Sequence, residues 1–133
     1  MQKFVIALVA ATGLLATPAV SAKSRMSGEE KLAKLLEGRE AGEPVNCISL
    51  NRARSTRIID RTAIVYDAGS TIYVNRPYNA RHLDDDDVLV TQLHSTQLCN
   101  VDIVHTVDRS ARFTTGFVSL DQFVPYRKIA RAD

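Results

Sequence analysis

The stretch Thr62–Val74, TAIVYDAGSTIYV, decides the fold, because it carries the strongest β-hairpin pattern in the chain. On both sides of a short turn it holds β-branched and aromatic residues, which pack well on a half-buried sheet. The turn, Asp67-Ala68-Gly69, fits a three-residue loop in which Gly69 adopts a left-handed conformation. The predicted pairs are Ile64 with Ile72 and Thr62 with Val74, and the opposite face carries Val65 and Tyr73.

Short runs of the same kind continue on both sides of this hairpin. The further strands that we expect are Cys47–Leu50, Thr56–Ile59, Val88–Leu93, Val101–Val107 and Phe113–Leu120. The segment Phe123–Tyr126 is expected to pack onto them as an irregular tail. Several short strands at regular spacing predict a mainly β protein of the α+β type. Its form would be a small antiparallel sheet, a sandwich or a partly closed barrel, with one short N-terminal helix.

The short helix is predicted over Ser27–Glu37. Ser27 and Glu30 have the spacing of a capping box, and Gly38 can end the helix. One apolar stripe runs along it, formed by Leu32, Leu35 and Leu36. Because a short helix is unstable alone in water, we expect this stripe to dock onto the β domain of the same chain. The polar segment Arg39–Pro44 is expected to be a linker.

The N-terminal residues 1–22 have the pattern of a signal peptide. Lys3 precedes an apolar run of signal-peptide length, and Val20-Ser21-Ala22 offers small residues for cleavage. A retained N-terminal anchor is the alternative, although the run is shorter than the ~20 apolar residues of a membrane span. We expect a periplasmic or secreted protein without a transmembrane segment after cleavage. Its parts would be a helix and linker (23–44), a disulfide-closed β domain (45–126) and a C-terminal tail (127–133).

The charge balance gives no indication of a nucleic-acid or anionic-membrane partner. The chain has 17 Lys and Arg residues against 15 Asp and Glu residues, and it contains no Trp. A balance this even produces no strong electrostatic field. One basic cluster is present, formed by Arg52, Arg54, Arg57 and Arg61. In an extended segment these arginines point to two different sides, so they form a poor track for phosphates.

Cys47 and Cys99 are the two cysteines of the chain. An even number of cysteines in an exported protein favours a structural disulfide. A reactive thiol and half of a metal site are the competing interpretations. No CxxC motif is present to lower a thiol pKa, and two cysteines alone form an incomplete zinc site.

Four consecutive carboxylates, Asp84–Asp87, are the most conspicuous polar feature. Hard cations such as calcium take several oxygen ligands, so this run suggests a metal site. In an extended segment, however, the four side chains would alternate between opposite faces, and the interleaved spacing of a calcium loop is missing. We therefore expect an acidic turn paired with Arg76 or Arg81, and we predict no metal and no cofactor.

The three histidines, His82, His94 and His105, do not have the spacing of a local chelate. His105 shares a strand face with Ile103 and Val107, where we expect a hydrogen-bonded, partly buried side chain. No motif presents a nucleophile with its base, so we predict no catalytic residue. A binding or envelope-interaction protein, with an envelope protein as a possible partner, is the favoured function. The alternatives are a metal-binding protein using Asp84–Asp87 and a small hydrolase whose site forms only on folding.

Several motifs resemble, in the same order, those of an uncharacterised family of small exported proteins from Gram-negative bacteria. They are Cys47-Ile48, Arg57–Val65, Tyr73-Val74-Asn75, Leu98–Ile103 and Gly116–Tyr126. The resemblance covers Val45–Tyr126, and it implies export and a β-rich domain without an established activity. Many members carry further cysteines near the positions of Arg81 and Val118, and this chain lacks them, so the resemblance implies no second disulfide.

The expected Cys47–Cys99 bond is directly testable. Non-reduced mature protein should be two hydrogens lighter than reduced protein, and it should yield one linked peptide pair by mass spectrometry. Reduction should lower the melting temperature, because a loop of this length contributes about 4 kcal/mol in the chain-entropy model. Free thiols in protein taken from its native compartment would contradict the prediction.

Overall fold

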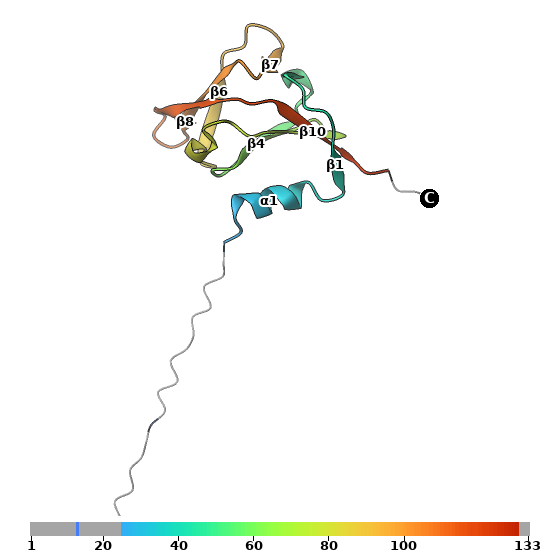
Figure 1. Cartoon of the computed structure of the whole chain (residues 1–133). Helices are drawn as coiled ribbons and strands as arrows, with labels where there is room; N and C mark the ends of the chain where they lie inside the picture. Colours follow the sequence, from blue (N-terminus) through green and yellow to red (C-terminus); the bar gives the residue numbers. More distant parts are fainter. Residues whose placement is uncertain (1–12, 14–24, 131–133) are drawn as a thin grey trace, which may run out of the picture.

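The computed structural model describes Gly13 and residues 25–130 of the chain (Figure 1). The expected signal peptide, residues 1–22, lies outside the described residues apart from Gly13. In chain order the elements are α1 (Gly28–Leu35), β1 (Arg39–Ala41), β2 (Cys47–Ser49), the 3₁₀ turn η1 (Leu50–Arg52), β3 (Ser55–Ile59), β4 (Ala63–Asp67), β5 (Thr71–Asn75), the 3₁₀ turn η2 (Ala80–His82), β6 (Asp87–Thr91), β7 (Gln97–Cys99), β8 (Ile103–Asp108), β9 (Thr114–Ser119) and β10 (Phe123–Lys128).

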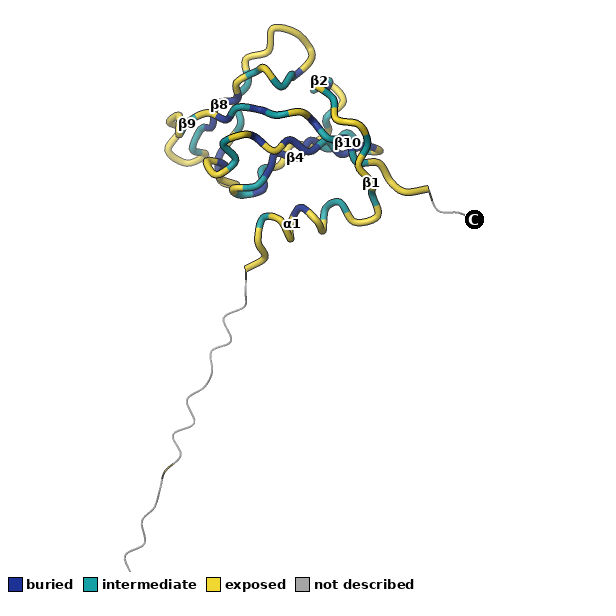
Figure 2. Tube along the Cα trace, viewed as in Figure 1, coloured by how far each residue is buried: buried dark blue, intermediate teal, exposed yellow. Residues whose placement is uncertain are grey.

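The strands form three antiparallel sheets, which confirms the predicted mainly β fold with one short helix. The central sheet has the order β1-β10-β5-β4-β3, and two smaller sheets have the orders β2-β7 and β6-β8-β9. Helix α1 lies against one face of the central sheet, and the two smaller sheets lie on the other side (Figure 1). The central sheet is therefore covered on both faces, and β4 is buried along most of its length (Figure 2).

The predicted hairpin is present as β4 and β5, and Gly69 has the expected positive φ of 86°. Its predicted register is wrong, because Ile64 lies opposite Asn75 and Val65 opposite Val74. The Ala68 amide donates to the Thr71 carbonyl at 2.9 Å. The turn therefore lies further along the chain than the predicted loop Asp67-Ala68-Gly69. An odd shift in register moves every β5 side chain to the other face.

Each face of the central sheet carries its own apolar core. The core beneath the small sheets is formed by Ile48, Ile64, Tyr66, Leu83, Leu98, Val104, Val118, Leu120 and Phe123. The core beneath the helix is formed by Leu32, Ile59, Ala63, Val65, Ile72 and Val74. Alternate residues of β4 enter different cores, as the two-residue repeat of a strand requires. Strand β4 therefore contributes side chains to both cores and joins the helix side of the molecule to the side of the small sheets.

Helix α1 docks onto its own β domain, as expected from its leucines. Both hydrogen bonds of the capping box are present. The Ser27 amide donates to the Glu30 carboxylate at 2.6 Å, and the Glu30 amide donates to the Ser27 hydroxyl oxygen at 3.2 Å. Leu32 is 2% exposed in the core beneath the helix, and Gly38 has a positive φ of 72° just after the helix. A bidentate ion pair between Glu29 and Arg76 adds a polar contact, and this guanidinium lowers the pKa of the Glu29 carboxyl.

Two predictions about irregular segments are wrong. Arg39–Ala41, expected to be linker, forms strand β1 and pairs with β10. Its side chains are mostly exposed, so the pairing depends on the backbone and leaves no apolar alternation in the sequence. Phe123–Tyr126, expected to be an irregular tail, is part of β10, which continues to Lys128. The β domain therefore extends beyond its expected end at Tyr126.

Pro125 is compatible with this inner strand because of where its missing amide would point. The amide and carbonyl of one residue in an antiparallel strand face the same neighbour. The Pro125 carbonyl accepts from the Gly42 amide at 2.7 Å, so the missing donor lies on that side. Pairing with β5, where Pro125 is opposite Tyr73, loses no hydrogen bond.

Strand β7 was not predicted, and it carries one half of the disulfide. Cys47 of β2 lies directly opposite Cys99 of β7, and the two are bonded. This confirms the expected disulfide. With only three residues, β7 is too short for alternation to be visible in the sequence. The Cys99 amide also donates to the Asp102 carboxylate at 2.7 Å, which holds the turn after β7.

The N-terminus of α1 approaches the β3–β4 turn so closely that only glycine fits at position 28. A Cβ atom on Gly28 would overlap the Thr62 hydroxyl oxygen and would lie 2.8 Å from the Asp60 carbonyl oxygen. The second of these atoms belongs to the backbone, so no change of rotamer can relieve the contact. The absence of a side chain at Gly28 therefore sets the distance between the helix and the sheet.

We predict that Gly28→Ala destabilises the protein by about 1 to 3 kcal/mol through this overlap. Helix propensity alone predicts the opposite sign, since alanine is favoured over glycine by about 1 kcal/mol inside helices. The measurement is the free energy of unfolding in urea. Gly116→Ala is the matched control, because a Cβ at Gly116 would meet only the Thr106 hydroxyl oxygen at 3.7 Å. Equal effects of the two substitutions would contradict the steric explanation.

Candidate functional site

A groove of about 940 Å³ separates the edge strand β3 of the central sheet from the edge strand β6 of the small sheet. We call it the edge groove. Helix α1 and Met26, which lies two residues before the helix begins, line one end, and Leu98 of β7 also lines the groove. The groove thus lies at the point where the central sheet, the helix and both small sheets meet.

The edge groove runs along the strand edges. Residues 56–59 of β3 line it without interruption, and so do residues 87–89 of β6. Consecutive strand residues point to opposite faces, so a cavity that contacts all of them must lie beside the strand. Each of these strands pairs with a neighbour on one side only, β3 with β4 and β6 with β8. One row of backbone amides and carbonyls on each strand therefore has no strand partner within residues 25–130.

The side of the groove that faces the small sheets is apolar. It is formed by Leu50, Ile58, Tyr66, Leu89 and Leu98. Tyr66 is 3% exposed, and its ring contacts Phe123 edge-to-face at a centroid distance of 5.8 Å. A buried phenol normally finds a hydrogen-bond partner.

The Tyr66 hydroxyl has no such partner among the described residues. Burial alone raises the pKa of the Tyr66 phenol above its ordinary value, with no hydrogen bond contributing. Every fully buried side-chain nitrogen or oxygen of the described residues has a hydrogen-bond partner. The Tyr66 hydroxyl has none, so it is not fully buried, and we infer that it is accessible from the groove that Tyr66 lines. A tyrosine phenol already carries its proton at neutral pH, so this hydroxyl can donate a hydrogen bond to whatever enters.

The side of the groove that faces the helix is cationic. Arg57 lies opposite Val65, whose side chain is in the core beneath the helix, so both point to the helix side. Lys31 and Lys34 line the same end from α1, and Arg109 adds a further cation.

Three of these four cations form no ion pair with a described carboxylate. Lys31 lies 3.9 Å from Asp85, and within the described ranges Arg57, Lys34 and Arg109 have no carboxylate within ion-pair distance. Asp87 lines the groove, but its carboxylate is buried and accepts from the Thr115 hydroxyl at 2.7 Å.

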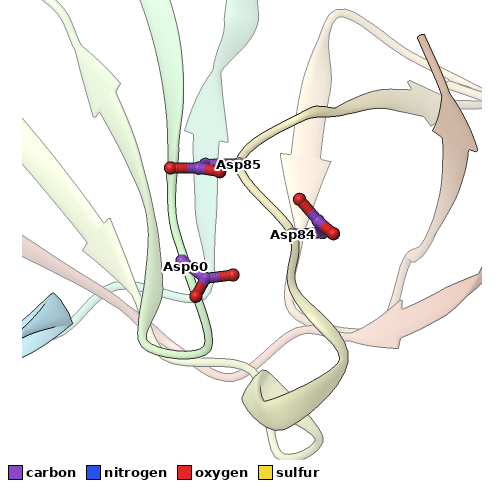
Figure 3. Close-up of side chains that lie close together, drawn as sticks. All are labelled: Asp60, Asp84 and Asp85. Carbon is purple, nitrogen blue, oxygen red and sulfur yellow. The ribbon is translucent and has the colours of Figure 1, made fainter. Parts of the chain in front are cut away.

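The aspartate run does not form a unit. Asp87 belongs to β6, whereas Asp84 and Asp85 come together with Asp60 from the β3–β4 turn (Figure 3). One carboxylate oxygen from each of these three residues lies within 4.8 Å of the others. The acidic turn that we expected is present, with the Asp86 amide donating to the Asp84 carboxylate at 2.9 Å. The argument that these side chains alternate between opposite faces assumed an extended segment, and it does not apply within a turn. Because of this turn, adjacent side chains can converge.

The expected arginine partners of this run are also wrong. Arg76 pairs with Glu29, and Arg81 donates to His82 at 3.1 Å. The described cation beside the aspartates is Lys31, at 3.9 Å from Asp85. The arginines were expected because they are close to the aspartates in sequence. In the folded chain, helix α1 lies beside this turn and provides Lys31 instead.

The histidines lie apart from one another and do not line the groove. His82 is in η2, His94 is in the loop before β7, and His105 is on β8. His105 was expected to be partly buried, but it is exposed. Its strand face is the outer one, which it shares with exposed Ile103, because Val104 and Thr106 occupy the inner face.

Of the basic cluster, only Arg57 reaches the groove. Arg54 instead packs beside Gly69 of the hairpin loop. The other lining residues come from distant parts of the chain, and no local motif joins them. Sequence reasoning singled out none of Tyr66, Lys34 and Arg109 as site residues. The unpaired tyrosine and the unpaired cations could be identified only once the cavity was known.

Comparisons with known proteins found no match. No family model matches the chain, no curated protein matches it, and no solved structure matches it. Membership in the family of exported proteins that the sequence resembles stays a prediction. No helix within the described ranges is long and apolar enough to cross a membrane.

We predict that the carboxylates of Asp60, Asp84 and Asp85 do not form a specific metal site. Calcium takes six to eight oxygen ligands, while this cluster offers three side chains, and Lys31 already offsets part of their charge. Calorimetric titration with calcium or zinc should give weak heats that disappear in moderate salt.

Two substitutions make this test specific. Asp85→Asn should leave those heats almost unchanged, and exposed Asp86→Asn serves as the matched control from the same turn. Micromolar affinity that Asp85→Asn abolishes and Asp86→Asn preserves would overturn the prediction.

Proposed function

We propose that this protein is a non-enzymatic binding domain that works outside the cytoplasm and holds its ligand in the edge groove. The observation that carries this proposal is the groove itself, with one apolar side and one cationic side. Concave sites that combine apolar walls with a few convergent polar groups are the usual form of ligand-binding sites. A ligand with both apolar and anionic parts matches these two sides.

A periplasmic or secreted location fits this role. The Cys47–Cys99 disulfide indicates an oxidising compartment, where such bonds persist. The signal-peptide pattern of residues 1–22 points to the same compartment. An envelope protein or another exported molecule would then be the partner that the groove meets.

The composition of the groove favours binding over hydrolysis. The described residues that line it include no serine, cysteine or histidine, so its two threonines, Thr56 and Thr91, have no histidine base beside them in the groove. Nucleophilic catalysis needs a nucleophile and a base within hydrogen-bond reach of each other. The polar groups that are present, a phenol, lysines, arginines and carboxylates, are suited to holding an anionic or carbonyl-bearing ligand.

A photo-crosslinking side chain placed on β3 tests the proposal. We predict that the probe at Thr56, which lines the groove, captures a discrete ligand when the protein is expressed in its native compartment. The probe at Ser55 is the matched control, since it is the preceding, equally exposed residue and does not line the groove. Arg57→Glu should lower the yield at Thr56, because it reverses one charge of the cationic side. Equal labelling at Thr56 and Ser55 would contradict the proposal.

A further inference from the structure

If the edge groove is a binding site, its shape and charge also identify the class of ligand. We infer that the groove takes an extended polypeptide segment of alternating acidic and apolar residues, which adds as a strand to the free edge of β3. This inference rests on the function proposed above and deepens it. Three independent features of the groove carry it: the free strand edge, the difference between its two sides, and the Tyr66 hydroxyl.

The first feature is the free backbone of β3. An added strand gains main-chain hydrogen bonds along such an edge, and the pockets beside the edge select its side chains. Residues 56–59 all border the cavity, so the free row is open over most of the strand. Elongated apolar ligands need no such row.

The choice of β3 over β6 follows from what covers each sheet. β3 belongs to the central sheet, which has the helix over one face and the small sheets over the other. A strand added there would find side-chain contacts on both faces. β6 belongs to a sheet whose outer face is solvent-exposed at Val88 and Val90, so a strand added there would be covered on one face only.

The second feature is the chemical difference between the two sides of the groove. Side chains of an added strand point alternately to the two faces of the central sheet. On the helix side they would meet Arg57 and Lys34, which favour acidic residues. On the other side they would meet Ile58, Leu89 and Leu98, which favour apolar residues. A strict alternation of acidic and apolar residues therefore matches the site.

The third feature is the Tyr66 hydroxyl. It is nearly buried, it has no partner among the described residues, and it contacts the groove. A ligand without a hydrogen-bond acceptor at this point would leave the phenol unsatisfied, which is unfavourable in a desolvated site. A polypeptide offers carbonyl oxygens at regular intervals, so it can accept this bond.

The test uses a capped octapeptide of alternating valine and glutamate as the probe, with affinity measured by calorimetry on the mature protein. We expect saturable binding that weakens with salt, because exposed charge pairs are screened. The same peptide with lysine in place of glutamate should bind at least about tenfold more weakly, since its contacts with Arg57 and Lys34 become repulsive. A version with alternate amides N-methylated, which cannot form one row of strand hydrogen bonds, should also lose binding.

Protein variants test the individual contacts. Arg57→Glu should weaken octapeptide binding about fivefold, while Arg52→Glu, on an exposed residue outside the groove, should leave it unchanged. Tyr66→Phe should weaken binding about threefold through the lost hydrogen bond, and Tyr73→Phe, which does not line the groove, is its control. Hydrogen exchange should show new protection of β3 amides in the complex, with β6 unaffected.

The outcomes separate this inference from the proposed function. Equal affinity of the N-methylated and parent peptides would overturn strand addition. Dodecanoate, an apolar carboxylate without backbone amides, should bind weakly. A different result would be that dodecanoate binds, that Arg57→Glu lowers its affinity, and that the octapeptide does not bind. The ligand would then be an amphiphile, which contradicts strand addition but keeps the groove as the binding site. If neither probe binds, and if labelling at Thr56 and Ser55 is equal, both the strand-addition inference and the proposed function are contradicted.

Discussion

The pairing of β4 with β5 is the constraint on which the rest of the structure depends. Their register sends Tyr66 and Ile64 toward the small sheets, and Val65, Ile72 and Val74 toward the helix. A shift of β5 by one residue would turn its apolar side chains to the opposite face of the sheet, so neither core would keep its buried residues. The same register directs Tyr66 to the groove and, through the β3–β4 pairing, directs Arg57 to the helix side.

The edge groove is a consequence of how the layers close. The central sheet ends at β3 and the small sheet begins at β6, and no described strand joins them. Natural proteins usually protect such edges with charges, irregular strands or covering elements. Here both edges instead border a cavity, and Arg57 is the charge that discourages uncontrolled pairing while it favours an acidic partner. Protection of the edge and recognition of a partner can thus depend on one side chain.

The aspartate turn and the helix are coupled through the same corner of the molecule. Gly28 brings the start of α1 against the β3–β4 turn, which also carries Asp60. Lys31, one turn later on the helix, then reaches Asp85, whose turn leads into β6. The helix thereby contacts both walls of the groove. Its position, and with it the width of the groove at this end, depends on the absence of a side chain at residue 28.

The sequence by itself determined the features that depend on neighbours in the chain. These are the mainly β class, the β4–β5 hairpin with its left-handed Gly69, the capping box at Ser27 and the pairing of the two cysteines. Alternation, turn chemistry and capping act over a few residues, and two cysteines allow a single pairing within one chain, so these signals can be read directly.

Only the tertiary structure decided the register of the hairpin, the inner position of β10, the convergence of Asp84 and Asp85 with Asp60, and the edge groove. Each of these depends on contacts between segments far apart in the chain, or on backbone pairing that leaves no side-chain pattern. Tyr66 reads as an ordinary strand tyrosine until the cavity beside it is known. The candidate site could not be predicted because its chemistry comes from groups that lack partners, and a missing partner is visible only in three dimensions.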